Sequence, residues 1–115
     1  MRNFRNLEIW QLGIEIVKLT YELLNKLPKS EDFGLKSQMQ RAAISIPSNI
    51  AEGCSRKSSK ELARYFEISI GSSFELETQM IASQMIGYLN QADFDKIIPM
   101  LNLFQKKTNA YLSTL

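Results

Sequence analysis

The residues of this chain offer few of the side chains that enzymes use most. Among its 115 residues there is no histidine, and there is one cysteine, Cys54. The absence of histidine removes the commonest general base, the commonest metal ligand and every serine–histidine–aspartate arrangement. One cysteine without histidine also leaves no usual set of zinc ligands. We therefore expect no enzymatic activity, no metal and no cofactor; chemistry based only on carboxylates or lysine is the remaining alternative.

Cys54 follows a predicted helix and precedes a run of basic residues close to the next helix start. Such surroundings can lower the pKa of a thiol. No base stands nearby in the sequence, so we interpret Cys54 as an incidental loop cysteine. A lone cysteine also excludes an internal disulfide and fits a reducing cytoplasm.

Basic residues cluster at the start of the third predicted helix. They are Arg56, Lys57, Lys60 and Arg64. A helix N-terminus presents free backbone amides and a partial positive charge, so basic side chains there predict a site for an anion or for RNA phosphates. The alternative is a solvated, charged helix end. Arg2 and Arg5 would join the cluster if the N-terminal segment folded beside it, although the net charge of +2 does not by itself indicate nucleic acid.

A second set of polar residues is predicted to lie inside the fold or at an interface. Its members are Arg41, Asn49, Glu52, Glu75 and Glu77. One interpretation is a carboxylate site for a metal or a reaction, but di-iron bundles use Glu-x-x-His pairs, which this chain lacks. We favour a structural network that fixes helix register, because buried polar groups must be paired. Within it we expect Glu77 to be largely buried and paired with a cation or an amide, with Arg41 as the first candidate partner.

Four amphipathic helices must position these residues, and the first is predicted over residues 7–27. It carries two apolar stripes, each with alternating spacings of three and four. The stripes are Leu7, Trp10, Ile14, Val17, Tyr21 and Leu24, and Ile9, Leu12, Ile16, Leu19 and Leu23. They lie on roughly opposite sides, because two residues turn a helix by about 200°. We expect part of this helix to meet another subunit; the alternative is a central position within its own fold.

The second helix is predicted from about residue 33 or 35 to residue 52, with Gly53 as its C-terminal stop. Pro47 lies inside it and should bend it. Its apolar stripe is Leu35, Met39, Ala42, Ile46 and Ile50.

The third helix is predicted from Ser58, in a capping box with Glu61, to about residue 89. Its stripe is Leu62, Phe66, Ile70, Phe74, Ile81, Met85 and Tyr88. The fourth is expected to begin at Asp93 as N-cap. Its apolar residues are Phe94, Ile97, Leu101, Phe104, Tyr111 and Leu112.

Short connections between amphipathic helices predict one all-α domain over residues 1–115, an antiparallel up-down-up-down four-helix bundle. The hydrophobic fraction of 44% and the charged fraction of 23% are ordinary for a globular protein. No apolar run is long enough to span a membrane. The first five residues precede no apolar core, so we expect no secretory signal and a cytoplasmic protein.

The run Arg-Ala-Ala-Ile-Ser-Ile-Pro-Ser-Asn-Ile-Ala-Glu-Gly at residues 41–53 resembles the signature of one bacterial family. That family is the four-helix-bundle proteins encoded in intervening sequences of 23S ribosomal RNA genes. Further positions also resemble its pattern: residues 7–10, 27–28 and 33–35, Glu31, Gln38, and the region of Glu75 and Glu77. The resemblance implies a ring-like homopentamer and no established enzymatic activity. A related branch of such bundles serves the reverse transcriptases of diversity-generating retroelements, as a basic pentamer that binds RNA.

These observations predict a non-enzymatic, homo-oligomeric scaffold or accessory protein whose partner is RNA or a ribonucleoprotein. The RNA partner rests mainly on the family analogy. The alternative is a protein–protein interaction module that binds no nucleic acid. An enzyme that uses carboxylates is a distant third.

Overall fold

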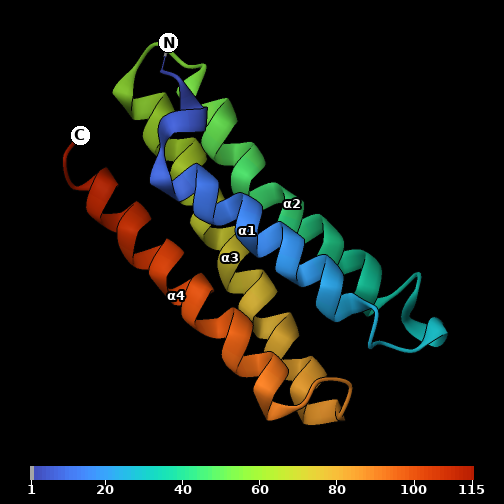
Figure 1. Cartoon of the computed structure of the whole chain (residues 1–115). Helices are drawn as coiled ribbons and strands as arrows, with labels where there is room; N and C mark the ends of the chain where they lie inside the picture. Colours follow the sequence, from blue (N-terminus) through green and yellow to red (C-terminus); the bar gives the residue numbers. More distant parts are fainter. Residues whose placement is uncertain (1) are drawn as a thin grey trace.

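The computed structural model describes residues 2–115, which form four long helices arranged as a bundle (Figure 1). They are α1 (Glu8–Leu24), α2 (Leu35–Cys54), α3 (Ser59–Ile86) and α4 (Gln91–Leu112), with short 3-10 helices η1 (Phe4–Asn6) and η2 (Lys29–Glu31). Each long helix runs opposite to the preceding one, consecutive helices pack on each other, and α4 packs back on α1. The predicted all-α four-helix bundle is confirmed. Within residues 2–115, no helix combines the length and apolar character that a bilayer crossing requires.

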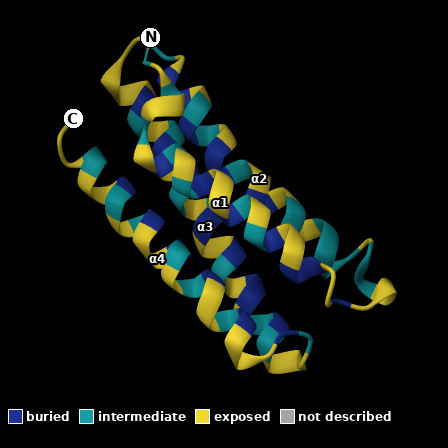
Figure 2. Cartoon of the chain, in the orientation of Figure 1, coloured by how far each residue is buried: buried dark blue, intermediate teal, exposed yellow. Residues whose placement is uncertain are grey.

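The core is formed by apolar residues buried between the helices. Figure 2 marks the buried positions in dark blue along all four helices. The largest fully buried members of the core are Ile16, Met39, Ile46, Ile50, Leu62, Phe66, Leu76, Met80, Ile97, Leu101 and Phe104. Most of the predicted stripes of α2 and α4 are among them, which confirms those two faces. Full burial of one such side chain contributes about 1.5–3 kcal/mol, so this core supplies most of the bundle's stability.

Helix α1 presents its two stripes very differently. Ile16 is fully buried, whereas Ile14 and Tyr21 of the other stripe keep 40% and 43% of their surface exposed. On a third side, a Cβ atom at Gly13 would lie 3.1 Å from the Pro47 Cβ, so glycine allows α1 and α2 to approach closely there. Helix α2 continues through Pro47. Of that other stripe, Leu24 is buried and Leu7, Trp10 and Val17 pack against the core, so the exposed part consists of Ile14 and Tyr21.

The predicted apolar stripe of α3 is wrong at three of its seven positions, whereas Tyr88, its last member, packs against the core. Leu62 and Phe66 are buried, but Phe74, Ile81 and Met85 are exposed. Residues spaced by four drift about 40° around a helix at every step, which carries such a stripe off the core. The buried face instead alternates spacings of three and four through Ser69, Ser73, Leu76, Met80 and Ser83. Its three serines gave no apolar signal in the sequence.

Gly53 does not stop α2 as predicted, because the helix continues through it to Cys54. Gly53 is buried, and a Cβ there would lie 3.0 Å from two ring carbons of Phe66. The residue therefore serves close packing of α2 on α3. In a sequence, a glycine is equally compatible with ending a helix and with close packing between helices. The position of the neighbouring helix decides between the two.

The start of α4 also corrects a prediction, since the N-cap is Asn90 and Asp93 is the third helical residue. The Asp93 N–H donates to Asn90 Oδ1 at 2.8 Å, and the Asn90 N–H donates to Asp93 Oδ2 at 3.1 Å. This reciprocal pair is a capping box. At α3 the predicted N-cap is confirmed, because Ser58 Oγ accepts from the Glu61 N–H at 3.1 Å.

Candidate functional site

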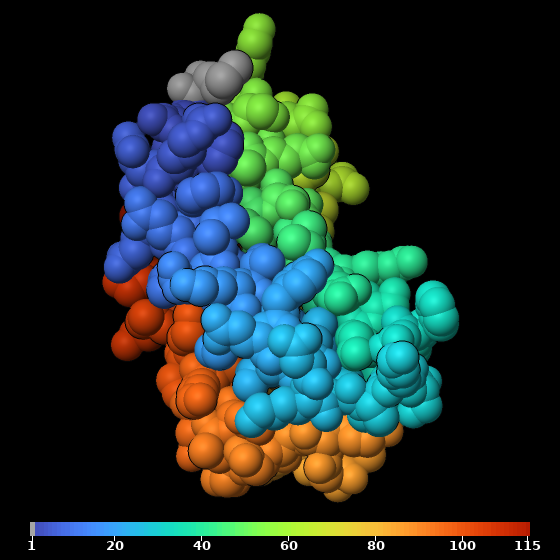
Figure 3. Space-filling view, turned by 45° about the vertical axis from the view of Figure 1, so that its right-hand side comes forward, coloured from blue at the N-terminus to red at the C-terminus, as the bar shows by residue number. Residues whose placement is uncertain are grey.

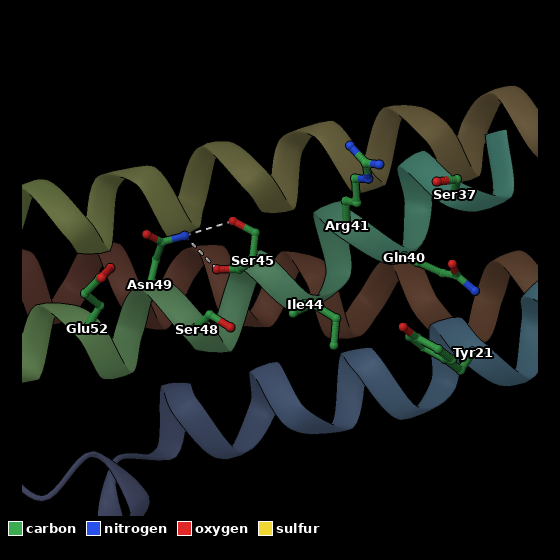
Figure 4. Close-up of a pocket in the computed structure, with 9 residues that line it drawn as sticks. All are labelled: Tyr21, Ser37, Gln40, Arg41, Ile44, Ser45, Ser48, Asn49 and Glu52. Carbon is green, nitrogen blue, oxygen red and sulfur yellow. Dashed lines mark hydrogen bonds between the residues drawn. The ribbon is translucent and has the colours of Figure 1, made fainter. Parts of the chain in front are cut away.

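A groove with a volume of about 550 Å³ runs along α2 beside α1 (Figure 4). Its lining residues are Tyr21, Ser37, Gln40, Arg41, Ile44, Ser45, Ser48, Asn49 and Glu52. Tyr21 comes from α1 and the others from α2. Tyr21 and Ile44 lie on the α1 side, whereas Arg41 points away from α1. The groove thus combines a polar helix face with two exposed apolar side chains and brings together three members of the predicted network.

Asn49 anchors a small polar cluster beside this groove. Its Nδ2 donates to the Ser45 carbonyl and to Ser45 Oγ, both at 2.8 Å. Ser45 Oγ lies 2.8 Å from Ser72 Oγ, which links α2 to α3. Asn49 was predicted from the sequence to belong to the polar network, but Ser72 was not, because a serine within a long helix does not by itself indicate a contact with another helix. Asn49 therefore takes part in a link between helices, with serines rather than with arginine or carboxylates.

The predicted pairing of Glu77 with Arg41 is wrong within the described chain. Glu77 is half-buried, and its Oε1 accepts from Gln105 Nε2 of α4 at 2.9 Å. Arg41 is exposed and shares a shallow pocket with Glu75. Two residues turn a helix by about 200°, so Glu75 and Glu77 face opposite sides of α3. Glu77 is therefore paired with an amide, one of the two expected partner types, but the partner comes from α4 and not from α2, where Arg41 lies.

The five predicted network residues do not form one connected network in the described chain. Arg41, Glu52 and Glu75 are exposed, and their side chains make no described hydrogen bond or ion pair within residues 2–115. Across residues 2–115, no group of three or more aspartate, glutamate, cysteine or histidine side chains is placed to hold a metal ion. Arg41 and Glu52 instead leave an exposed polar face on α2.

Cys54 is buried at the C-terminal end of α2, not in a loop. Burial raises the pKa of its thiol, although the nearby Arg2 cation acts in the opposite direction. A thiol with a raised pKa is protonated and unreactive at neutral pH. Cys54 therefore belongs to the core.

The predicted basic cluster lies at one end of the bundle, where α2 passes into α3. Arg56 packs over Tyr65, with its guanidinium carbon 4.8 Å from the ring centroid and Nη2 donating to the Tyr65 hydroxyl at 2.9 Å. Lys57, Lys60 and Arg64 are exposed. The cluster thus combines one cation held by an aromatic ring with three that project into solvent.

The N-terminal segment folds against the same end. The Arg2 N–H donates to the Cys54 carbonyl at 3.2 Å, and Figure 3 shows the first residues beside the segment that joins α2 to α3. Arg2 and Arg5 therefore join the cluster, a placement that sequence analysis left conditional. We call the six residues the basic end: Arg2, Arg5, Arg56, Lys57, Lys60 and Arg64.

Charge is distributed unevenly along the bundle. A cut through the midpoints of the four helices divides the bundle into two halves. The half that contains the basic end comprises residues 2–16, 45–72 and 102–115; it holds 8 lysines and arginines and 5 acidic residues, so its net charge is 8 − 5 = +3. The other half, residues 17–44 and 73–101, holds 6 and 7, 6 − 7 = −1. The net charge of +2 therefore conceals a basic half and a slightly acidic half.

The ion pairs of residues 2–115 all use lysine. They are Lys26–Asp93, Lys36–Asp32 and Lys107–Glu8. The five arginines of the chain make none of them. Arginine is the side chain best suited to grip phosphate, because its planar fork donates two parallel hydrogen bonds. Four of the five lie at the basic end.

Comparison with known proteins gives a family and a fold. The model of the 23S rRNA-intervening sequence protein family matches residues 5–110. A crystal structure from Bacteroides thetaiotaomicron, described as a protein with unknown function from the S23 ribosomal protein family, is similar with a TM-score of 0.84. It is 17% identical in sequence, and the match covers 90% of this chain and 97% of the other. No curated protein matches the sequence.

Proposed function

The chain belongs to the 23S rRNA-intervening sequence protein family, and from this premise we propose that it is a non-enzymatic, RNA-binding scaffold that works as a homo-oligomer in the cytoplasm. The lack of histidine in the sequence and the burial of its single cysteine support the non-enzymatic part of this proposal.

The basic end is the observation that carries the RNA-binding proposal. It places six cations, four of them arginines, on the half of the bundle whose net charge is +3. None of those arginines is neutralised by a described carboxylate within residues 2–115. Phosphate contacts dominate the affinity of proteins for nucleic acid and release counterions. Most phenylalanine and tyrosine rings are partly or fully buried, so base-specific contacts are few and we expect little sequence preference.

Exposed apolar side chains support the self-association that the proposal includes. Ile14, Tyr21 and Ile44 are uncovered on the α1–α2 side, and Phe74 and Ile81 on α3. Contiguous apolar patches of this kind mark interaction surfaces. The family resemblance favours a pentamer, whose five copies would carry 5 × 2 = +10 and could hold one RNA at several sites. Light scattering at micromolar concentration tests this part, and a mass of 13.2 kDa would contradict it.

Matched charge variants test RNA binding. One variant changes Lys57, Lys60 and Arg64 of the basic end to glutamine. Its control changes Lys18, Lys29 and Lys96 of the opposite half to glutamine; all six side chains are exposed. Both variants lose three charges, so only the position of the loss differs.

Filter binding of a structured RNA across a salt series gives the readout. Each neutralised phosphate contributes about 0.7 to the log–log slope on a single strand, so the first variant should lose about 2 from the slope while the control keeps it. Circular dichroism and light scattering must show unchanged helicity and mass. Equal losses in the two variants would contradict the role of the basic end.

A protein–protein interaction module without nucleic acid is the second candidate. The C-terminal half of α3 favours it, because Met85 and Ile86 keep 80% and 59% of their surface exposed. If the parent protein fails to retain RNA at about 50 mM salt, where phosphate contacts are strongest, this candidate becomes the better explanation.

A further inference from the structure

A pocket with a volume of about 330 Å³ lies at the basic end, against the N-terminal segment. It is lined by Arg2, Asn3, Phe4, Arg5, Ala51 and Ser55. No carboxylate is among these residues, and neither arginine side chain makes a described hydrogen bond or ion pair within residues 2–115. The pocket therefore offers two uncompensated guanidinium groups beside an aromatic ring.

Hydrogen bonds to the body of the bundle hold the segment that forms this pocket. The Arg2 N–H donates to the Cys54 carbonyl at 3.2 Å. Asn3 Oδ1 accepts from the Arg5 N–H at 3.2 Å, and Gln11 Nε2 of α1 donates to the Arg5 carbonyl at 3.0 Å. The segment is thus tied to both α1 and α2, so its two arginines have fixed backbone positions.

Arg5 is also positioned through its side chain. Its guanidinium carbon lies 4.6 Å from the centroid of the Phe4 ring, and that ring lies 5.3 Å from the Trp10 ring at an interplanar angle of 59°. A guanidinium held over an aromatic ring by a cation–π contact is a planar group with an outer face. Arginine planes of this kind stack on RNA bases.

We propose that this pocket binds one nucleotide unit of a single RNA strand, with its phosphate on Arg2 and Arg5 and its base against the guanidinium plane of Arg5. The inference rests on the proposed RNA-binding function and assigns its most specific contact. Ligand sites begin at about 300 Å³, so the pocket exceeds what a bare phosphate requires. Stabilisation of the C-terminal dipole of α2 would explain basic residues at this position, but not an aromatic stack beside a pocket of this size.

The single tryptophan provides a direct readout, because Trp10 touches Phe4 at the edge of the pocket. The probes are adenosine 5′-monophosphate, adenosine and inorganic phosphate. Trp10 emission is excited at the red edge of the indole band, where adenine does not absorb, and equilibrium dialysis of labelled nucleotide measures the same affinity independently. We expect saturable binding of the nucleotide, tighter than that of either fragment.

Three variants locate the site. Arg5→Gln should weaken nucleotide binding by about tenfold or more, since a charge-assisted hydrogen bond is worth at least that. Arg5→Lys keeps the positive charge but lacks the planar guanidinium group, so the nucleotide affinity of this variant should fall between those of the parent and Arg5→Gln. Lys106→Gln removes one exposed charge from the same half of the bundle, outside both the pocket and the basic end, and should change the affinity less than about twofold. Circular dichroism confirms the fold of each.

The outcomes separate this proposal from the wider function. RNA retention on filters combined with no nucleotide binding, or with equal effects of Arg5→Gln and Lys106→Gln on nucleotide affinity, overturns the pocket and leaves RNA binding intact. Phosphate binding as tight as nucleotide binding overturns the role of the base. Nucleotide binding without RNA retention supports the pocket and overturns the wider function.

Discussion

The two ends of the bundle use their charged residues in opposite ways. At the end opposite the basic end, charges pair with each other: Lys26 Nζ lies 2.5 Å from Asp93 Oδ1 and joins α1 to α4. The Tyr88 hydroxyl donates to Glu31 Oε2 at 3.0 Å, which ties the α3–α4 connection to the α1–α2 connection and raises the pKa of Tyr88.

The basic end has almost none of this internal pairing. Its close contacts are packing contacts, such as Gly53 against Phe66, and backbone bonds, such as that between Arg2 and Cys54. Packing maintains the fold there, and the arginines of this end take part in none of the ion pairs of residues 2–115. The comparison teaches that charge pairing stabilises one end, whereas close packing stabilises the other and leaves its cations largely unpaired.

Substitution of Gly53 by valine should have the largest effect on stability. A Cβ at this position would already lie 3.0 Å from the Phe66 ring, and a β-branched side chain needs more room. Overpacking of a core costs about 1–3 kcal/mol, and we expect about 3 kcal/mol here. Urea unfolding followed by circular dichroism measures it. The exposed Gly71, whose Cβ would meet nothing within 4 Å, provides the control as Gly71→Val. Equal losses at both positions would mean that close packing does not hold the basic end.

Replacement of Asp93 by alanine should cost about 2 kcal/mol in the free energy of unfolding. The change removes one half of a capping box, worth about 1 kcal/mol, and a charge-assisted bond to a lysine that is 47% exposed. Asp95→Ala, in the same helical turn but exposed, should cost less than about 0.5 kcal/mol. If the two variants unfold at the same urea concentration, the ion pair does not stabilise this end.

The contribution of Asp93 should disappear in acid. Its hydrogen bond with Lys26, followed by the backbone bond from Asn90, lowers the pKa of the carboxyl from its ordinary 3.8, against the effect of burial. A folded-state pKa below the unfolded value stabilises the protein above the unfolded value, and this stabilisation is lost as the pH falls through the folded value. The difference between the parent and Asp93→Ala should therefore be constant from about pH 5 to 7 and shrink below about pH 3.9. Urea titrations at several pH values measure it, and a gap that widens in acid would contradict the assignment.

Arg56→Gln should have the smallest effect on stability, within about 1 kcal/mol, because its contact with Tyr65 is a partly exposed cation–π pair. Its effect on RNA should be larger: the salt slope of binding should fall by about 0.7, the contribution of one phosphate. Lys29→Gln at the opposite end, also exposed, should change neither quantity. A loss of stability without any change in slope would assign Arg56 to the fold rather than to a ligand.

The sequence predicted the number of helices, their bounds to within about three residues and the core faces of α2 and α4, because local apolar periodicity carries that information. It misjudged α3, where the buried face is built from Ser69, Ser73 and Ser83. Small polar residues are buried where helices approach closely, and nothing in their own segment indicates this. The same limit explains why Ser72 was missed as a partner of Ser45.

Among the candidate site residues, the sequence by itself determined the basic cluster and the lack of histidine, since both depend only on residue types and nearby spacing. Only the tertiary structure decided which distant groups meet. It placed Glu77 beside Gln105, turned Arg41 outward and brought Arg2 to Cys54. These contacts depend on how far each helix is rotated about its axis and on how the chain ends fold back. Such rotations are fixed by packing between helices, which no single segment of the sequence specifies.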